Sequence, residues 1–173
     1  IEEKIKILTG KEINLLSDDF FDQGFANRYT LADLEMDLDN KIMKRKICII
    51  TGSRADYGLM QILINKFHKD KDIELKIFAT GMHLLSEFGN TYKEIIKDGF
   101  RIEKKVKILS SSDAPTAISK STGLGIMRFA SLFDSAKPDL LVVLGDRYEI
   151  MSAVIAANFH QIPVAHIGGG DTT

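Results

Sequence analysis

Cysteine is almost absent from this chain, and this scarcity excludes a disulfide-stabilised fold. Its 173 residues include one cysteine, Cys48, so no disulfide can form within the chain. Cys48 lies in an apolar run, where a free cysteine is more often core filling than a functional thiol. A reduced, cytoplasmic setting is therefore expected.

Long apolar runs and an excess of either charge are also missing. No run approaches the ~20 apolar residues that a membrane helix needs. The 23 Lys and Arg residues against 24 Asp and Glu residues leave a formal net charge of −1, which offers no electrostatic basis for binding nucleic acid. We therefore expect neither a membrane nor a nucleic acid as partner.

Sequence motifs for common cofactors are missing as well. Neither the dinucleotide motif G-x-G-x-x-G nor a Walker phosphate-binding loop occurs. The histidines do not recur at the spacing of metal ligands, such as H-x-x-x-H. We therefore expect no cofactor and no metal.

From residue 46 onward, strand patterns alternate with helix patterns. Apolar runs predict strands at 46–51, 73–80, 101–108, 140–144 and 162–167. Helical periodicity predicts helices at 58–68, 86–98, 115–136 and 148–159. The first helix is expected to bury one stripe, made of Leu59, Ile62, Leu63 and Phe67. This alternation is typical of right-handed crossovers and of a doubly wound parallel α/β sheet of the Rossmann-like class.

Residues 1–42 do not share this pattern. They are acidic toward residue 42, and their leucines at 31, 34 and 38 fall on one helical face. We predict a helical appendage of unknown role at 1–42 and an α/β domain at 43–173, beginning at Met43.

Three loops that follow predicted strands contain most of the chemically capable residues. They span residues 51–58, 145–149 and 166–171. Parallel strands present their carboxyl ends at one edge of the sheet, and ligands bind in the crevice there. We therefore expect these loops to meet around one pocket for an anionic, sugar-like ligand.

Several residues of this edge are candidates for ligand binding. Gly52 permits a tight turn, and the planar guanidinium groups of Arg54 and Arg147 can bind a phosphate or a carboxylate. In the alternative, Arg54 pairs with Asp56 at the surface. His83 follows another strand at the same edge and could line the crevice. A glycine run fits a backbone that a ligand approaches closely, namely Gly168, Gly169 and Gly170.

Two further residues are candidates for catalysis. Asp146 directly follows an apolar strand, where a rigidly held carboxylate can act as an acid or a base. In the alternative, Asp146 caps the next helix and Arg147 neutralises it. His166 ends another strand and is either a site residue or a structural one. Glu149 is expected to be a surface or capping charge, and the histidines at helix ends, His68 and His160, are expected to be exposed.

Taken in order, several segments resemble the amino-terminal domain of the hydrolysing UDP-N-acetylglucosamine 2-epimerases, which open sialic acid and related nonulosonate biosynthesis. The segments are TGSRADYG (51–58), TGMHL (80–84) with FGNTY (88–92), LGDRYE (144–149) and AHIGGGD (165–171). The resemblance implies a two-domain fold of the glycosyltransferase-B type, with the active site between the domains. Residues 43–173 would supply the first of these domains, which would be inactive alone. The resemblance also implies that the full-length protein forms a dimer or tetramer.

The resemblance also implies a reaction, in which UDP-N-acetylglucosamine and water give UDP and N-acetylmannosamine. UDP leaves while a proton is removed from C2, and water then adds to the glycal-like intermediate. Asp146 would be the acid/base group, Arg54 and Arg147 would bind the diphosphate, and His166 would line the sugar site.

The chain departs from many relatives at two positions of the last segment. Some relatives have a catalytic glutamate where this chain has Gly168, and many have glutamate where it has Asp171. Asp171 is therefore a candidate to supply the missing carboxylate. The departure leaves two alternatives open: a UDP-linked 2,4-diacetamido-trideoxyhexose of legionaminic acid biosynthesis as the substrate, or a B-type glycosyltransferase.

Overall fold

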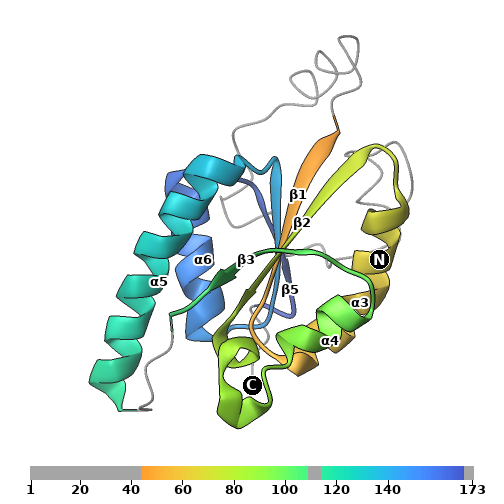
Figure 1. Cartoon of the computed structure of the whole chain (residues 1–173). Helices are drawn as coiled ribbons and strands as arrows, with labels where there is room; N and C mark the ends of the chain where they lie inside the picture. The colour runs from red at the N-terminus through yellow and green to blue at the C-terminus, as the bar shows by residue number, and fades with distance from the viewer. Residues whose placement is uncertain (1–43, 109–113, 170–173) are drawn as a thin grey trace. The chain divides into compact units, whose positions relative to one another are not determined.

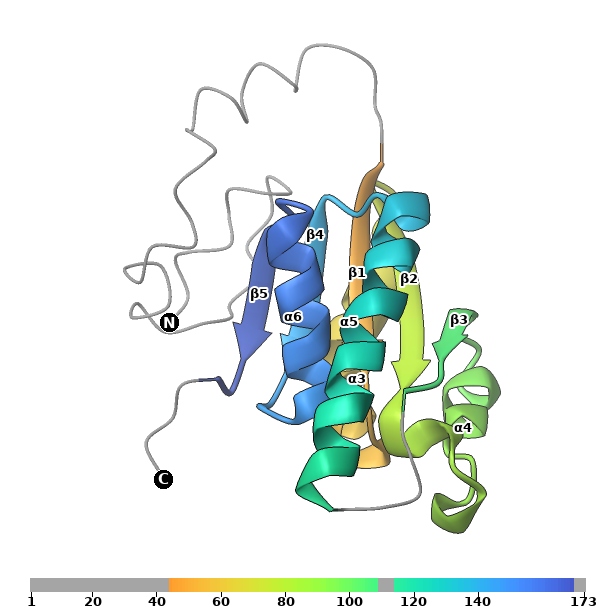
Figure 2. The same cartoon turned by 90° about the vertical axis from the view of Figure 1, so that its left-hand side faces the viewer.

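The computed structural model describes residues 44–108 and 114–169, and residues 45–173 group into one compact unit. The strands are β1 (Arg45–Thr51), β2 (Ile73–Thr80), β3 (Ile102–Val106), β4 (Leu140–Leu144) and β5 (Val164–Ile167). They form a five-stranded sheet in the order β3-β2-β1-β4-β5, and every pairing is parallel. Figure 2 shows this order across the sheet.

Helices cover both faces of the sheet. They are α3 (Arg54–Lys69), α4 (Tyr92–Lys97), α5 (Pro115–Ala136) and α6 (Tyr148–Phe159). In Figure 1 the sheet is seen nearly edge-on, with α5 and α6 on one side and α3 and α4 on the other. This arrangement confirms the predicted α/β, Rossmann-like class.

The core lies between the central strands and their helices. Strands β1 and β4 are apolar because both of their faces are covered. Cys48 in β1 is fully buried, as expected of core filling, and burial raises the pKa of its thiol to about 12. Helix α5 packs on α6, and its Phe129 and Phe133 rings lie in the core cluster with Cys48.

Three details of the predicted helices are wrong. The helix expected at 58–68 is α3, which begins four residues earlier, at Arg54, within the segment expected to be a loop. The helix expected at 86–98 is a short 3₁₀ turn (Ser86–Phe88) followed by α4, because Gly89 and Asn90 adopt left-handed conformations that interrupt it. In α3, Leu59 and Ile62 are 73% and 74% exposed, although they were assigned to the buried stripe. The face that meets the sheet is instead formed by Tyr57, Met60, Leu63, Ile64 and Phe67.

Residues 1–42, Gly170 and Asp171 lie outside the described residues. The helical appendage, the boundary at residue 43 and the proposed roles of Gly170 and Asp171 therefore stay predictions.

Candidate functional site

The predicted site residues that the structure describes lie at or just beyond the carboxyl ends of four neighbouring strands. Loops after β2, β1, β4 and β5 follow one another along this edge of the sheet. The backbone N–H of His83, after β2, donates to the carbonyl oxygen of Gly52, after β1, at 3.1 Å. The N–H of Gly145, after β4, donates to the carbonyl of Ile167 in β5 at 2.9 Å. These bonds join neighbouring loops in pairs, whereas a single pocket shared by the three predicted loops stays a prediction.

The loop after β1 is held by its own polar groups. The Ser53 hydroxyl caps α3 by accepting the N–H of Asp56 at 3.3 Å. Asp56 is mostly buried, and its Oδ2 accepts the N–H of Gly52 at 3.3 Å. Arg54 pairs with a carboxylate of another helix, because its Nε donates to Glu94 Oε2 in α4 at 2.9 Å. The alternative of an Arg54–Asp56 pair is therefore wrong.

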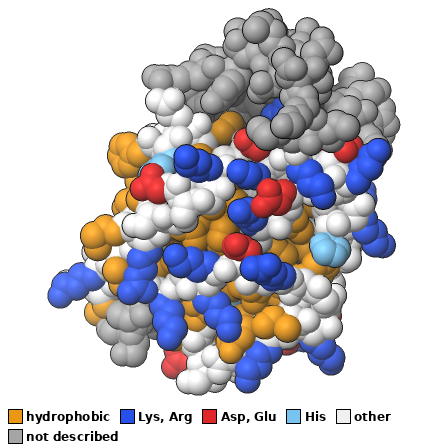
Figure 3. Space-filling view, turned by 45° about the horizontal axis from the view of Figure 1, so that its top comes forward, with side chains coloured by type: hydrophobic (Ala, Val, Ile, Leu, Met, Phe, Trp, Pro, Cys, Tyr) orange, Lys and Arg blue, Asp and Glu red, His pale blue; other side chains and the backbone are white. Residues whose placement is uncertain are grey.

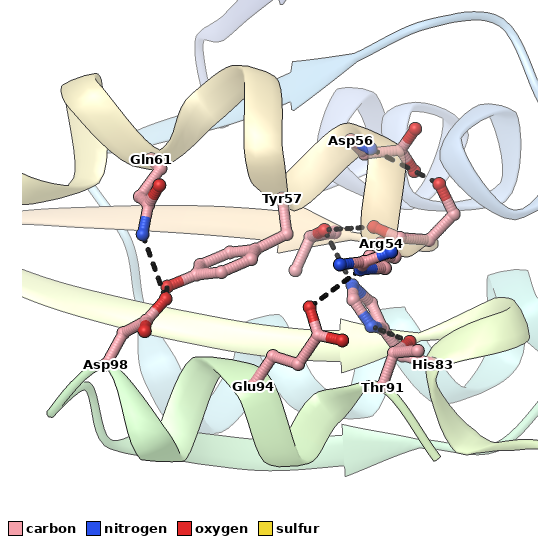
Figure 4. Close-up of polar contacts among 10 residues, drawn as sticks. Arg54, Asp56, Tyr57, Gln61, His83, Thr91, Glu94 and Asp98 are labelled. Carbon is pink, nitrogen blue, oxygen red and sulfur yellow. Dashed lines mark hydrogen bonds and ion pairs between the residues drawn. The ribbon is translucent and has the colours of Figure 1, made fainter. Parts of the chain in front are cut away.

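His83 is completely buried, contrary to the expectation that it lines an open crevice. Its Nε2 lies 3.0 Å from Thr51 Oγ1 and its Nδ1 lies 2.8 Å from Thr91 Oγ1. Burial lowers the pKa of the ring below its ordinary value, and the negative charges of Asp56 and Glu94 only partly oppose this effect. His83 therefore acts as a neutral link between the loops after β1 and β2 (Figure 4).

The most deeply buried charge at this edge is Glu149, so the expectation of a surface or capping charge is wrong. Its side chain is fully inaccessible, and its Oε1 accepts the Nε–H of Arg147 at 2.7 Å. A Cβ built on Gly52 would lie 3.0 Å from Oε1, and one built on Gly81 would lie 2.9 Å from it. Gly81 also has a left-handed φ of +58°. These two glycines therefore leave the space that the Glu149 carboxylate fills.

Asp146 and Arg147 lie side by side in sequence but do different things. Asp146 is exposed, and the N-cap residue of α6 is Arg147, without any side-chain cap. The alternative in which Asp146 caps the helix is therefore wrong, and Arg147 pairs with Glu149 and not with Asp146. Asp146 remains accessible to a ligand, and its catalytic role stays a prediction.

The loop after β5 is linked to the loop after β4 by His166. Its ring is half-buried, and Nε2 donates to the carbonyl oxygen of Gly145 at 2.5 Å. A Cβ built on Gly169 would lie 2.3 Å from the ring, so this glycine makes room for His166. Gly168 is exposed and has a left-handed φ of +63°. His166 thus has a structural function here, and a ligand role for it or for these glycines stays a prediction.

An open depression between α3 and α4 was not anticipated from the sequence. Asp98 Oδ2 accepts hydrogen bonds from the Tyr57 hydroxyl at 2.7 Å and from the Gln61 side-chain amide at 2.9 Å. The Arg54–Glu94 ion pair also lines this depression (Figure 4). Burial, with the adjacent Asp98 carboxylate, raises the pKa of Tyr57, so its hydroxyl stays a donor. These bonds fasten α4 to α3.

The described part of the chain shows neither a membrane-spanning helix nor a cluster of metal-ligating side chains. Among residues 44–108 and 114–169 no helix is long and apolar enough to cross a membrane. The same residues contain no group of three or more His, Cys, Asp or Glu side chains that could hold a metal ion. On the face seen in Figure 3, Lys and Arg side chains predominate, with fewer Asp and Glu side chains among them.

Comparison with known proteins assigns the family. A model of the family described as UDP-N-acetylglucosamine 2-epimerase matches residues 65–173. The chain is 45% identical over 130 residues to a GDP/UDP-N,N'-diacetylbacillosamine 2-epimerase (hydrolyzing) of Campylobacter jejuni, covering 75% of this chain and 34% of that protein. It is 31% identical over 129 residues to a UDP-N-acetylglucosamine 2-epimerase of Neisseria meningitidis, covering 75% and 33%.

Solved structures support the same fold. The crystal structure of the Neisseria meningitidis UDP-GlcNAc 2-epimerase bound to UDP-GlcNAc superimposes with a TM-score of 0.63 and 23% identity, covering 74% of this chain and 33% of that one. The chain spans about a third of the length of the relatives it matches. The chain therefore belongs to the UDP-N-acetylglucosamine 2-epimerase family.

Proposed function

We propose that this chain forms the amino-terminal part of a hydrolysing 2-epimerase whose substrate is a nucleotide-linked 2,4-diacetamido sugar, UDP-N,N'-diacetylbacillosamine. The observation that carries the sugar assignment is the difference in identity between two relatives. It is 45% for the diacetylbacillosamine enzyme and 31% for the N-acetylglucosamine enzyme, over nearly the same number of residues. This difference favours the sugar that the sequence analysis placed second.

The reaction consumes the nucleotide sugar and one water molecule. The bond between C1 and the diphosphate oxygen breaks, and the proton on C2 passes to a base of the enzyme, leaving a double bond between C1 and C2. Water then supplies a hydroxyl to C1, and an acid returns a proton to C2 from the opposite face. The products are UDP and the free sugar inverted at C2.

In this scheme Asp146 is one acid/base group, because it is an exposed carboxylate at the end of a rigid strand. Arg147 and Arg54 neutralise the charge that develops on the departing diphosphate. Asp171 supplies a second carboxylate, and the loop with His166, Gly168, Gly169 and Gly170 lies against the sugar. The partner domain holds most of the nucleotide.

The test uses two chimeric enzymes. In one, the Campylobacter jejuni relative supplies the sequence that follows residue 173, and in the other the Neisseria meningitidis relative supplies it. UDP release is measured with UDP-N,N'-diacetylbacillosamine, its GDP-linked form and UDP-N-acetylglucosamine. If both chimeras prefer the diacetamido sugar, this chain determines the sugar preference. If each chimera instead prefers the substrate of the relative that supplies its second part, the sugar assignment is contradicted.

The same assay separates the reaction classes. A hydrolysing epimerase releases UDP without an acceptor, and in ²H₂O its product carries deuterium at C2. Release that requires an added acceptor, without deuterium at C2, would instead identify a glycosyltransferase. We expect no turnover by the 173-residue chain alone, because it spans about a third of the length of the enzymes it matches.

A second candidate substrate is UDP-N-acetylglucosamine, favoured by the 31% identity to the Neisseria meningitidis enzyme. This reading would place the protein at the start of sialic acid biosynthesis. It predicts N-acetylmannosamine as the product in both chimeras.

We further propose that the protein forms a homo-dimer or tetramer in the cytoplasm. Light scattering of the active chimera measures its oligomeric state.

A further inference from the structure

Glu149 is a buried carboxylate that the reaction scheme above does not use. One of its oxygens, Oε1, accepts the Nε–H of Arg147, while Oε2 has no hydrogen-bond partner among the described residues. Burying an ionised carboxylate with a single charge-assisted bond is expensive. The fold nevertheless makes room for it, because Gly52 and Gly81 lack the Cβ atoms that would collide with it.

The burial of Glu149 limits what it can do. Since no part of its side chain is accessible, it cannot touch a ligand in this arrangement. Its one polar partner among the described residues is Arg147, whose side chain is 42% exposed. A chain of contacts from Glu149 to a bound ligand must therefore pass through the Arg147 guanidinium.

The pair leaves Arg147 ready to bind an anion. A guanidinium has five N–H donors, and Glu149 engages only the one on Nε. The donors on the two terminal nitrogens make no hydrogen bond within the described residues. Holding Nε fixes the plane of the group, so less rotamer freedom is lost when the terminal donors meet a diphosphate.

We propose that Glu149 is a positioning residue that holds the Arg147 guanidinium at the strand-end edge, oriented to receive the diphosphate of the substrate. The ligand named here rests on the proposed function. The loops after β1 and β2 take part indirectly, because Gly52 and Gly81 define the space in which the carboxylate sits.

A simple electrostatic argument predicts the opposite effect of removing Glu149. If this carboxylate only added negative charge near the site, the neutral Glu149→Gln variant would bind UDP more tightly. Positioning predicts weaker binding, because the amide holds the guanidinium less firmly. The sign of the change in the UDP dissociation constant therefore discriminates between the two.

The binding test uses the active chimera and calorimetry with UDP. We expect Glu149→Gln to weaken UDP binding about tenfold, the order of one charge-assisted hydrogen bond. When Arg147→Ala is already present, adding Glu149→Gln should weaken UDP binding no further. The matched control is Glu103→Gln, because Glu103 pairs with Arg101 at the same spacing of two residues but is exposed on β3. The control should bind UDP like the parent. Unchanged or tighter binding in Glu149→Gln, or equal weakening with and without Arg147, would overturn the proposal.

A second measurement does not depend on UDP or on turnover. In ¹H–¹⁵N spectra of the 173-residue chain, the Nε–H of Arg147 should give a slowly exchanging signal, assigned by its loss in Arg147→Lys. Glu149→Gln should shift it and speed its exchange, while Glu103→Gln should not; an unchanged signal in Glu149→Gln would refute the positioning. If the parent chimera bound UDP but never released it from a nucleotide sugar, the proposed function would fail and the positioning of Arg147 would stand.

Discussion

The contact between α5 and α6 allows a stability prediction with a built-in control. A Cβ on Gly125 in α5 would lie 2.7 Å from Ser152 Oγ and 2.8 Å from Ser152 Cβ in α6. Ser152 is fully buried, and its hydroxyl lies within hydrogen-bond distance of the carbonyl oxygens of Tyr148 and Thr122, at 2.7 Å and 3.1 Å. It therefore cannot move aside without losing packing and hydrogen bonds. Gly123, two residues earlier in the same helix, is exposed and has nothing within 4 Å of its Cβ position.

Replacing each glycine by alanine separates helix propensity from packing. Both substitutions gain about 1 kcal/mol of helix propensity. Only Gly125→Ala also overpacks the helix interface, at a cost of about 1–3 kcal/mol. We therefore expect Gly123→Ala to raise the free energy of unfolding by about 0.5–1 kcal/mol and Gly125→Ala to lie about 1–3 kcal/mol below it.

Urea unfolding of the 173-residue chain, followed by circular dichroism, measures both variants. A Gly125→Ala protein as stable as Gly123→Ala would show that the helices separate freely at this point and would refute the reasoning. Adding Ser152→Gly tests the cause, because removing the colliding atoms should make the combined loss smaller than the sum of the single losses.

Three further predictions concern the strand ends and the core. Gly81→Ala should destabilise the chain by about 1–3 kcal/mol more than Gly89→Ala. Both glycines have a left-handed φ, but only a Cβ at residue 81 would collide with the Gly52 carbonyl oxygen, at 2.7 Å. Equal losses of stability in urea unfolding would contradict this. Since burial lowers the pKa of His83 below 6.5, the unfolded chain takes up that proton first. The free energy of unfolding should thus fall as pH drops below about 6.5, more steeply than in His83→Gln; parallel pH profiles would count against it. Because burial raises the pKa of Cys48 to about 12, its thiol should resist Ellman's reagent at pH 8 until urea unfolds the chain, and rapid labelling of the native chain would disprove its burial.

The sheet could be predicted from sequence because local patterns determine each strand and helix. The apolar run at 140–144 and the helix at 148–159 have the predicted bounds. The stripe on α3 was wrong for a reason that periodicity cannot reveal. Leu59 and Ile62 are apolar, but the direction in which α3 meets the sheet is set by tertiary packing of Tyr57, Met60 and Ile64.

Glu149 shows a second limit, which a different signal could have lessened. A carboxylate in the first turn of a helix is usually solvated, so the surface was the natural expectation. However, α6 is apolar on nearly all sides, as expected of a helix packed between other elements, and such a helix offers its charged residue no wet face. The apolar composition of residues 150–157 was thus evidence against a surface charge at 149.

The glycines at this edge of the sheet give the sharpest lesson about inferring sites from motifs. A glycine beside a predicted site suggests close approach of a ligand. Here three glycines accommodate side chains of the protein itself: Gly52 and Gly81 make room for Glu149, and Gly169 makes room for His166. Each of these side chains bonds to the loop after β4, through Arg147 or through Gly145. The glycines therefore support the surface that carries Asp146 and Arg147, and a substitution at any of them should disturb that surface through the displaced Glu149 or His166 side chain.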